Sequence, residues 1–243
     1  LVQPQDPKTK LDYIYAHLSN FSYVDLPSEN NVYPGEYTSE SVWMIMYKDE
    51  FTQNQYLPGW MSSGNRNSEY YSAHKSSYRN HSIHPYFWQE FETSGAPAGF
   101  ERDPRAFSTC YLEGDIMDFR PENTDHYPPN YFTVGINVKA NAKNRGISIP
   151  GQPSPEFGLK KYFFPVYYED VAPKNAPTNR NYIRYADVLL MYAEVMYLLG
   201  DDGSGLEALN EVRRRVDMPD IAELSPEAII HERDIELATE GWR

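Results

Sequence analysis

Near the C-terminal end, two apolar helical segments follow each other with almost no connection, and this feature constrains the fold more than any other. Residues 182–199 are apolar on nearly every side of a helix, which is typical of a helix buried on more than one side. The run Gly200–Ser204 ends this helix, and Ser204 is the expected N-cap of the next one. Because the connection is so short, the two helices should be antiparallel neighbours. The second helix directs four apolar residues to the first: Leu206, Leu209, Val212 and Val216.

A third helix is expected from Ser225, as N-cap, with Pro226 in its first turn, to about Thr239. Small residues, Ala193 and Ala208, stand at the expected contact of the first two helices, which gives the pair the rhythm of a tetratricopeptide unit. A single unit of this kind cannot bury its own faces. The other clear helical pattern is at Lys8–Asn20, so the sequence is expected to be part of a longer chain.

The middle of the sequence, residues 21–180, largely lacks a helical period and is interrupted by proline-containing turns. Buried strands are expected at Ser41–Tyr47, Tyr131–Val138 and Tyr162–Tyr168, and one or two helical turns at Pro85–Glu92. We therefore predict a mainly α fold. It is one domain over residues 1–243, with a helix in 1–20, a loop-rich ligand-recognition region in 21–180 that contains short strands, and a tetratricopeptide-like α-α superhelix scaffold in 181–243.

Charge and composition exclude several classes of function. The 22 Lys and Arg residues against 35 Asp and Glu residues give a net charge of −13, which argues against nucleic-acid partners and anionic membrane surfaces. The longest apolar run, Val188–Leu199, is interrupted by Glu194 and is too short to span a membrane. A single cysteine, Cys110, cannot form an internal disulfide. The chain starts at Leu1 rather than Met, which is expected of a processed or partial sequence.

Aromatic residues are concentrated between Tyr56 and Trp88, in a sequence with 21 tyrosines. A sugar ring presents an apolar C–H face and a rim of hydroxyls, which aromatic rings and Asn or Arg side chains match. We therefore predict a glycan site, with at least one of Trp60, Tyr70 and Tyr71 touching the ligand. The alternative is that half of these aromatics fill the core, as we expect for Trp43 and Trp88. The full set of predicted ligand-binding residues is Trp60, Tyr70, Tyr71, Tyr56, Asn65, Arg66 and Asn67.

Patterns for catalysis, metals and cofactors are weak. Asp187 and Glu194 share one face of a mostly buried helix, where ion pairs with Arg184, Arg213, Arg214 or Arg233 are a better explanation than acid–base chemistry. His81 and His84 match no zinc spacing, and Asp201–Gly205 lacks the alternating ligands of a calcium loop. We predict no catalytic residues, no metal and no cofactor.

Three stretches together resemble the SusD-like (RagB/SusD) family of outer-membrane nutrient-binding lipoproteins of the Bacteroidetes. The specific one is the helix Arg184-Tyr-Ala-Asp-Val-Leu-Leu-Met-Tyr-Ala-Glu194. Ala208–Arg213 and Glu232–Gly241 follow in order, and Asp103-Pro-Arg105 and Lys161-Tyr162 are weaker landmarks. The resemblance covers roughly Ser39 to Arg243. The sequence departs from the family pattern at Val195, Asp234 and Thr239.

This resemblance implies a non-catalytic glycan-binding protein that is lipid-anchored at the cell surface of the outer membrane. It would be the lid of a SusC-like TonB-dependent transporter, with a scaffold of signature helices and a ligand held by aromatic side chains in the middle region. The lipidated cysteine would lie outside this sequence, since Cys110 is in mid-chain. Two alternatives stay open: a peptide-binding member of the same family, and a glycoside hydrolase that uses carboxylates such as Glu90, Asp103 or Asp115.

Overall fold

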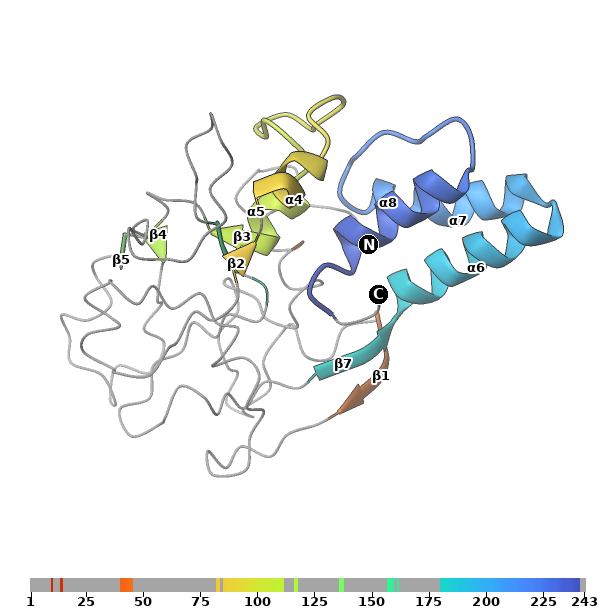
Figure 1. Cartoon of the computed structure of the whole chain (residues 1–243), viewed down its shortest axis with the longest axis horizontal. Helices are drawn as coiled ribbons and strands as arrows, with labels where there is room; N and C mark the ends of the chain where they lie inside the picture. The colour runs from red at the N-terminus through yellow and green to blue at the C-terminus, as the bar shows by residue number, and fades with distance from the viewer. Residues whose placement is uncertain are drawn as a thin grey trace.

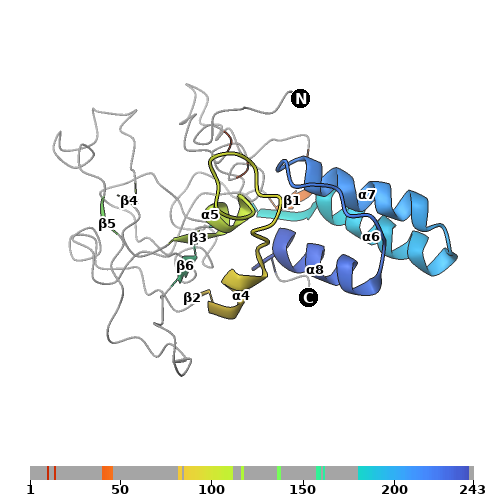
Figure 2. The same cartoon turned by 90° about the horizontal axis from the view of Figure 1, so that it is seen from above.

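A computed structural model describes residues 10, 14, 40–45, 82–83, 85–111, 116–117, 136–137, 157–159, 161 and 180–240. A helical part, formed by the C-terminal residues, lies beside a part with short strands and two short helices (Figures 1 and 2). In chain order the elements are β1 (Ser41–Ile45), β2 (Ser82–Ile83), α4 (Pro85–Glu90), α5 (Arg105–Thr109), β3 (Cys110–Tyr111), β4 (Ile116–Met117), β5 (Ile136–Asn137), β6 (Phe157–Leu159), β7 (Arg180–Arg184), α6 (Tyr185–Leu199), α7 (Asp202–Arg214) and α8 (Pro226–Glu236).

Helices α6 and α7 form the predicted hairpin. Gly200 ends α6 with a left-handed backbone at φ 78°, a conformation that glycine adopts without a Cβ clash. The N-cap of α7 is Asp201, whose side chain accepts hydrogen bonds from the Ser204 backbone N–H at 3.2 Å and from its hydroxyl at 2.7 Å. The prediction of Ser204 as N-cap was therefore wrong by three positions, because the residue that starts the helix is the carboxylate and not the hydroxyl.

The contact between α6 and α7 is made by small and aliphatic side chains. Ala193 and Ala208 are both buried in it, as predicted, together with Leu190, Leu209 and Val212. Helix α8 begins at the predicted cap, where the Ser225 hydroxyl accepts from the Ala228 backbone N–H at 3.1 Å. It ends at Glu236 rather than near Thr239. Ile229 brings α8 into the same core as the hairpin.

Strands β1 and β7 pair antiparallel, and β7 leads directly into α6. Helix α6 therefore starts at Tyr185, three residues later than its apolar pattern predicted. Strand β1 lies within the predicted Ser41–Tyr47 strand, but the prediction that it is buried was wrong, because Val42 and Trp43 are exposed. The two strands form a sheet of their own, separate from β2, β3 and β6.

A second sheet, separate from the antiparallel pair that β4 and β5 form, has the order β2-β6-β3, with α4 and α5 beside it. Its core contains Ile83, Phe91, Ala106 and Cys110, and Ile235 of α8 packs into the same cluster. Helix α4 confirms the helical turns expected at Pro85–Glu92. Strand β5 lies inside the expected strand at residues 131–138, whereas residues 162–168 lie outside the described residues.

Of the expected N-terminal helix, the structure describes two residues, and both have helical backbone. Ile14 is buried against Val216 and Met218 after α7, and Lys10 forms an ion pair with Asp217. These two residues therefore contact the end of the hairpin. Among the described residues, no helix has the length and apolar character needed to cross a bilayer.

Candidate functional site

The predicted ligand-binding residues all lie outside the described residues. They are Tyr56, Trp60, Asn65, Arg66, Asn67, Tyr70 and Tyr71, and they remain predictions. His81 and His84, which were considered as metal ligands, also lie outside the described residues. What the structure describes is a helical scaffold with a buried charged network, an apolar pocket, and the aromatic pair of Trp43 and Tyr182.

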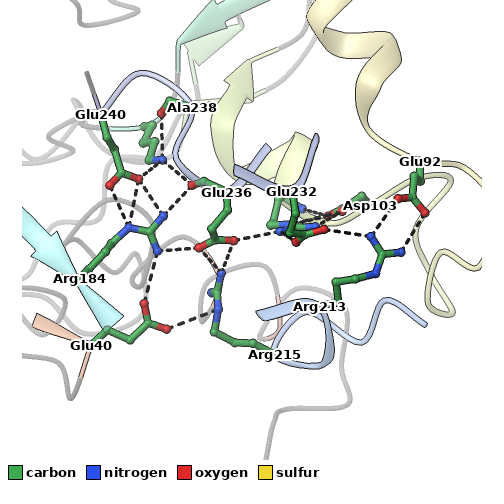
Figure 3. A network of polar contacts seen from close by, with 12 residues as sticks. Glu40, Glu92, Asp103, Arg184, Arg213, Arg215, Glu232, Glu236, Ala238 and Glu240 are labelled. Carbon is green, nitrogen blue, oxygen red and sulfur yellow. Dashed lines mark hydrogen bonds and ion pairs between the residues drawn. The ribbon is translucent and has the colours of Figure 1, made fainter. Parts of the chain in front are cut away.

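The centre of this scaffold is a buried network of charged side chains (Figure 3). It gathers the sequence landmarks Asp103-Pro-Arg105, Lys161 and Arg184 around one row of carboxylates on α8 and the residues after it. Glu232 and Glu236 lie four apart on one side of α8, and Glu240 follows four residues later, beyond the end of the helix. Among the described residues, the network has the cations Arg105, Lys161, Arg184, Arg213 and Arg215 and the anions Glu40, Glu92, Asp103, Glu232, Glu236 and Glu240, with His231 at its edge.

Arg105 joins the short-strand part to α8. Its Nη1 lies 2.5 Å from Glu232 Oε1 and 3.0 Å from Glu236 Oε2, and its Nη2 lies 2.7 Å from Asp103 Oδ2. Asp103 also accepts from the Arg105 backbone N–H at 2.9 Å, which fixes the start of α5. All four of these side chains are at most 1% exposed, so each charge depends on its partners in place of water.

Arg184, at the end of β7, holds the other end of the row. Its Nε and Nη2 donate to the two oxygens of Glu240 at 2.9 and 2.8 Å, a bidentate pair, and its Nη1 lies 2.6 Å from Glu236 Oε1. Lys161 Nζ donates to Glu240 Oε1 at 2.5 Å and to the backbone oxygens of Glu236 and Ala238 at 3.1 and 3.0 Å. Lys161 thereby satisfies carbonyls that the end of α8 leaves without a helical partner.

Glu236 is the hub of the network. Arg105, Arg184 and Arg215 all approach its carboxylate within 3.0 Å. Burial alone would raise the pKa of Glu236, but the charges of Arg215, Arg184 and Arg105 outweigh burial and hold the pKa well below its ordinary value. Glu236 is therefore ionised across the physiological range and acts as a counter-ion rather than as a proton donor.

Glu92 and His231 form the more exposed edge of the network. Glu92 accepts from Nη1 and Nη2 of Arg213, both at 2.9 Å, and His231 Nε2 lies 3.5 Å from Glu92. Hydrogen bonds from His231 and Arg213 lower the pKa of Glu92 to about 2. The same bond to Glu92 raises the pKa of His231 above its ordinary value. The two side chains therefore stabilise each other's charged forms.

The network holds residues on both sides of the segment that carries the predicted recognition residues. Glu40 precedes β1 and Glu92 follows α4, on either side of the segment with Tyr56 to Tyr71. Arg105 and Lys161 lie in the same way on either side of the stretch between α5 and β6. Positions that are far apart in sequence are thus connected to α8, Arg105 directly and Glu40 through Arg184.

Carboxylates considered for catalysis have other roles where the structure describes them. Asp187 pairs with Arg233 at 3.1 Å, one of the ion pairs expected from the sequence. Glu194 is exposed, and Asp103 belongs to the buried network. Glu90 lies 3.6 Å from His231 Nδ1 at the surface, and Asp115 lies outside the described residues. Among the described residues, no cluster of His, Cys, Asp and Glu has the arrangement to hold a metal ion.

A pocket of about 610 Å³ opens between α4, α6 and α8. Its walls are mainly apolar, with three charged side chains at Glu194, Arg233 and Asp234. Phe87 and Tyr197 are the aromatic residues in its lining. The pocket thus has fewer aromatic side chains than the segment predicted to bind sugar. No local sequence pattern indicates this pocket, because its walls come from three helices that meet only in the fold.

Trp43 was expected in the core, but 57% of its surface is exposed. Its ring lies 5.2 Å from that of Tyr182 on the neighbouring strand, with the planes tilted by 45°. Trp88, also expected in the core, is partly buried against Phe91 and Phe107, with the Arg102 guanidinium over its ring at 4.6 Å. The sequence pattern around Trp43 indicates a strand, but it cannot show that a two-stranded sheet leaves this face open.

Comparisons with known proteins identify the family to which this chain belongs. The SusD family model matches residues 39–243, so the chain belongs to the SusD family. The SusD-like protein P38 of Formosa agariphila is 25% identical over 226 residues, which are 87% of this chain and 40% of that protein. The buried charged landmarks and the signature helix are thus features of a SusD scaffold.

Solved structures share the fold at lower identity. A SusD-like protein from Bacteroides fragilis superposes with a TM-score of 0.58 at 19% identity, over 99% of this chain and 45% of that one. Surface glycan-binding protein A from Bacteroides thetaiotaomicron, in complex with laminarihexaose, superposes with a TM-score of 0.54 at 20% identity, over 97% and 48%. The chain therefore has the SusD fold, mainly α and tetratricopeptide-like, and spans less than half the length of these relatives.

Proposed function

We propose that this protein is a non-catalytic glycan-binding protein of the outer-membrane surface that acts as the lid of a TonB-dependent transporter. Membership of the SusD family carries the proposal, because the matched range, residues 39–243, includes the aromatic segment from Tyr56 to Tyr71. The relative that was solved with laminarihexaose supports a neutral oligosaccharide as the ligand class. The net charge of −13 also favours a neutral or basic ligand over a sulfated one.

The chemistry of the scaffold supports binding rather than catalysis. A glycoside hydrolase needs two carboxyl groups that face each other across a sugar-sized gap, one of which must hold a proton. The buried carboxylates Asp103, Glu232 and Glu236 instead contact Arg105 within 3.0 Å and fill its hydrogen-bonding capacity. A proton donor at these positions would leave the guanidinium groups without counter-ions. We therefore assign ligand recognition to the segment from Tyr56 to Tyr71 and structural support to the buried network.

Titration calorimetry of the full-length protein against neutral oligosaccharides and peptides tests the proposal. Trp60→Ala should weaken glycan binding by roughly 1–3 kcal/mol, about 5- to 150-fold in Kd, through loss of an aromatic platform. Trp43→Ala is the matched control, because it makes the same change at an exposed tryptophan outside the predicted segment.

The titration, together with an assay for released reducing ends, distinguishes glycan binding from the alternatives. Loss of affinity in Trp43→Ala but not in Trp60→Ala would move the site to the β1–β7 sheet. Heat from peptides and none from sugars would refute glycan binding in favour of peptide binding. New reducing ends in the incubated sugar, absent from a mock sample, would contradict the non-catalytic assignment.

A further inference from the structure

The pocket between α4, α6 and α8 is lined neither by the predicted glycan-binding residues nor by the buried charged network. Its volume of about 610 Å³ is within the usual range of small-molecule sites. Its walls come from Phe87 of α4, from the C-terminal part of α6, and from α8 and the residues that follow it. Most of the described lining side chains are apolar, among them Leu198, Ile229, Ile230 and Leu237. A ligand of this pocket therefore needs an apolar body.

The charged side chains of the pocket determine which charge such a ligand has. Glu194 and Asp234 are carboxylates, and Arg233 is the single cation among the described lining residues. Arg233 already has a counter-ion, because its Nη2 lies 3.1 Å from Asp187 Oδ1 and the two side chains are only 20% and 6% exposed. This ion pair compensates its own charge, so the two other carboxylates give the described lining an excess of negative charge. A cation is therefore attracted to the pocket and an anion repelled.

Two aromatic side chains, Phe87 and Tyr197, add a second attraction for a cation. The face of an aromatic ring is electron-rich, and proteins use such faces to recognise ammonium ligands. Both rings are held by packing on the side of the protein core. Phe87 meets Phe91 edge to face at a centroid distance of 5.2 Å, and Tyr197 packs against the core of the α6–α7 hairpin. The aromatic part of the site is thus preorganised.

We propose that this pocket binds a small organic ammonium compound. The hydrocarbon part of the ligand packs on the apolar walls, and its protonated amine is attracted to Glu194 and Asp234 and to the aromatic rings. A neutral oligosaccharide has neither the positive charge nor the apolar body that these side chains favour. The pocket is then a second site, separate from the segment proposed to bind glycan, and this inference does not rest on the proposed function.

Three probes of nearly equal size and different charge test the proposal: phenethylammonium, phenethyl alcohol and phenylacetate. Their affinities for the full-length protein are measured by NMR titration at low ionic strength, where charge effects are least screened. We expect phenethylammonium to bind most tightly and phenylacetate most weakly. Glu194→Gln, at an exposed position of the pocket, should weaken phenethylammonium about twofold to fivefold and leave phenethyl alcohol unchanged. Glu223→Gln is the matched control, because it removes the same charge from an exposed residue outside the pocket lining.

The order of the three affinities and the comparison of the two variants decide the result. The expected order, with a loss in Glu194→Gln and none in Glu223→Gln, supports the proposal. Equal affinities of the three probes would overturn it, because the pocket would then select an apolar body regardless of charge. Absence of phenethylammonium binding would overturn it as well. An equal loss in the two variants would also overturn it, since the attraction would then come from the net charge of the protein rather than from the pocket.

Discussion

Removal of one charge at the hub of the network should destabilise the protein strongly. Glu236→Gln keeps the shape of the side chain but leaves Arg105, Arg184 and Arg215 sharing fewer negative charges in a buried site. Breaking a buried ion pair costs about 3–5 kcal/mol, because the remaining charge has lost both its partner and water. Here three guanidinium groups approach within 3.0 Å of the lost carboxylate, so we expect a loss in the upper part of that range.

Urea unfolding, followed by circular dichroism, measures this loss as a change in the free energy of unfolding. The matched control is Glu207→Gln, which breaks an ion pair with Arg214 at 2.5 Å, the same close range, at the surface of α7. The control should change stability little, because water solvates both of its partners. Equal losses of unfolding free energy in Glu236→Gln and Glu207→Gln would refute the conclusion that burial makes the ion pairs of Glu236 important for stability.

The pH dependence gives the same prediction a second test. The pKa of Glu236 is lower in the folded protein than its ordinary value of 4.5, so its contribution to stability is present above about pH 4.5. This contribution is lost as the pH falls through the folded pKa. The stability difference between the wild type and Glu236→Gln should therefore be constant near neutral pH and shrink below pH 4.5. A difference that grew on acidification would contradict the assigned ion pairs.

Three further predictions follow from the described contacts. Gly205→Ala should destabilise the protein by about 1–3 kcal/mol, because the new Cβ would lie 2.6 Å from a Leu224 methyl group. Gly203→Ala meets no atom closer than 3.9 Å and should stabilise the protein by about 0.5–1 kcal/mol. The midpoints of urea unfolding compare the two variants. Ser225→Ala should cost about 0.5–2 kcal/mol by removing the cap of α8, and Ser225→Asp should restore most of it in the same assay. His231→Gln should reduce Tm below about pH 6.5, and the difference from the wild type should vanish as the pH rises through the elevated pKa of His231; a loss that persisted at pH 9 would contradict the pairing with Glu92.

The local sequence predicts the helices of the scaffold well, since their existence depends on neighbouring residues. The apolar period and the Ser225-Pro226 start locate α8, and the small residues at Ala193 and Ala208 locate the hairpin contact. The start of α7 was misplaced because Asp201 and Ser204 bond to each other, and either is a good cap from sequence alone. The burial of β1 was mispredicted because burial depends on a covering layer, which strand periodicity does not report.

The charged network could be predicted only in part. The four-residue spacing of Glu232, Glu236 and Glu240 is visible in the sequence and indicates a row of carboxylates on one side of a helix. Arg105, the partner of Glu232 and Glu236, lies more than 120 residues earlier, and no local pattern indicates that these side chains meet. The family resemblance marked both stretches without giving their physical role, which is mutual charge compensation. The ligand-binding residues Trp60, Tyr70 and Tyr71 stay a prediction.

Hydrogen–deuterium exchange of the full-length protein, with and without a saturating oligosaccharide, tests the central claim most directly. The claim is that loops bind the sugar while the helical scaffold and its ion network only support them. We predict slower exchange on binding within residues 56–71 and unchanged exchange in α6, α7 and α8. Protection confined to those helices, or to the pocket between α4, α6 and α8, with residues 56–71 unchanged, would contradict the account.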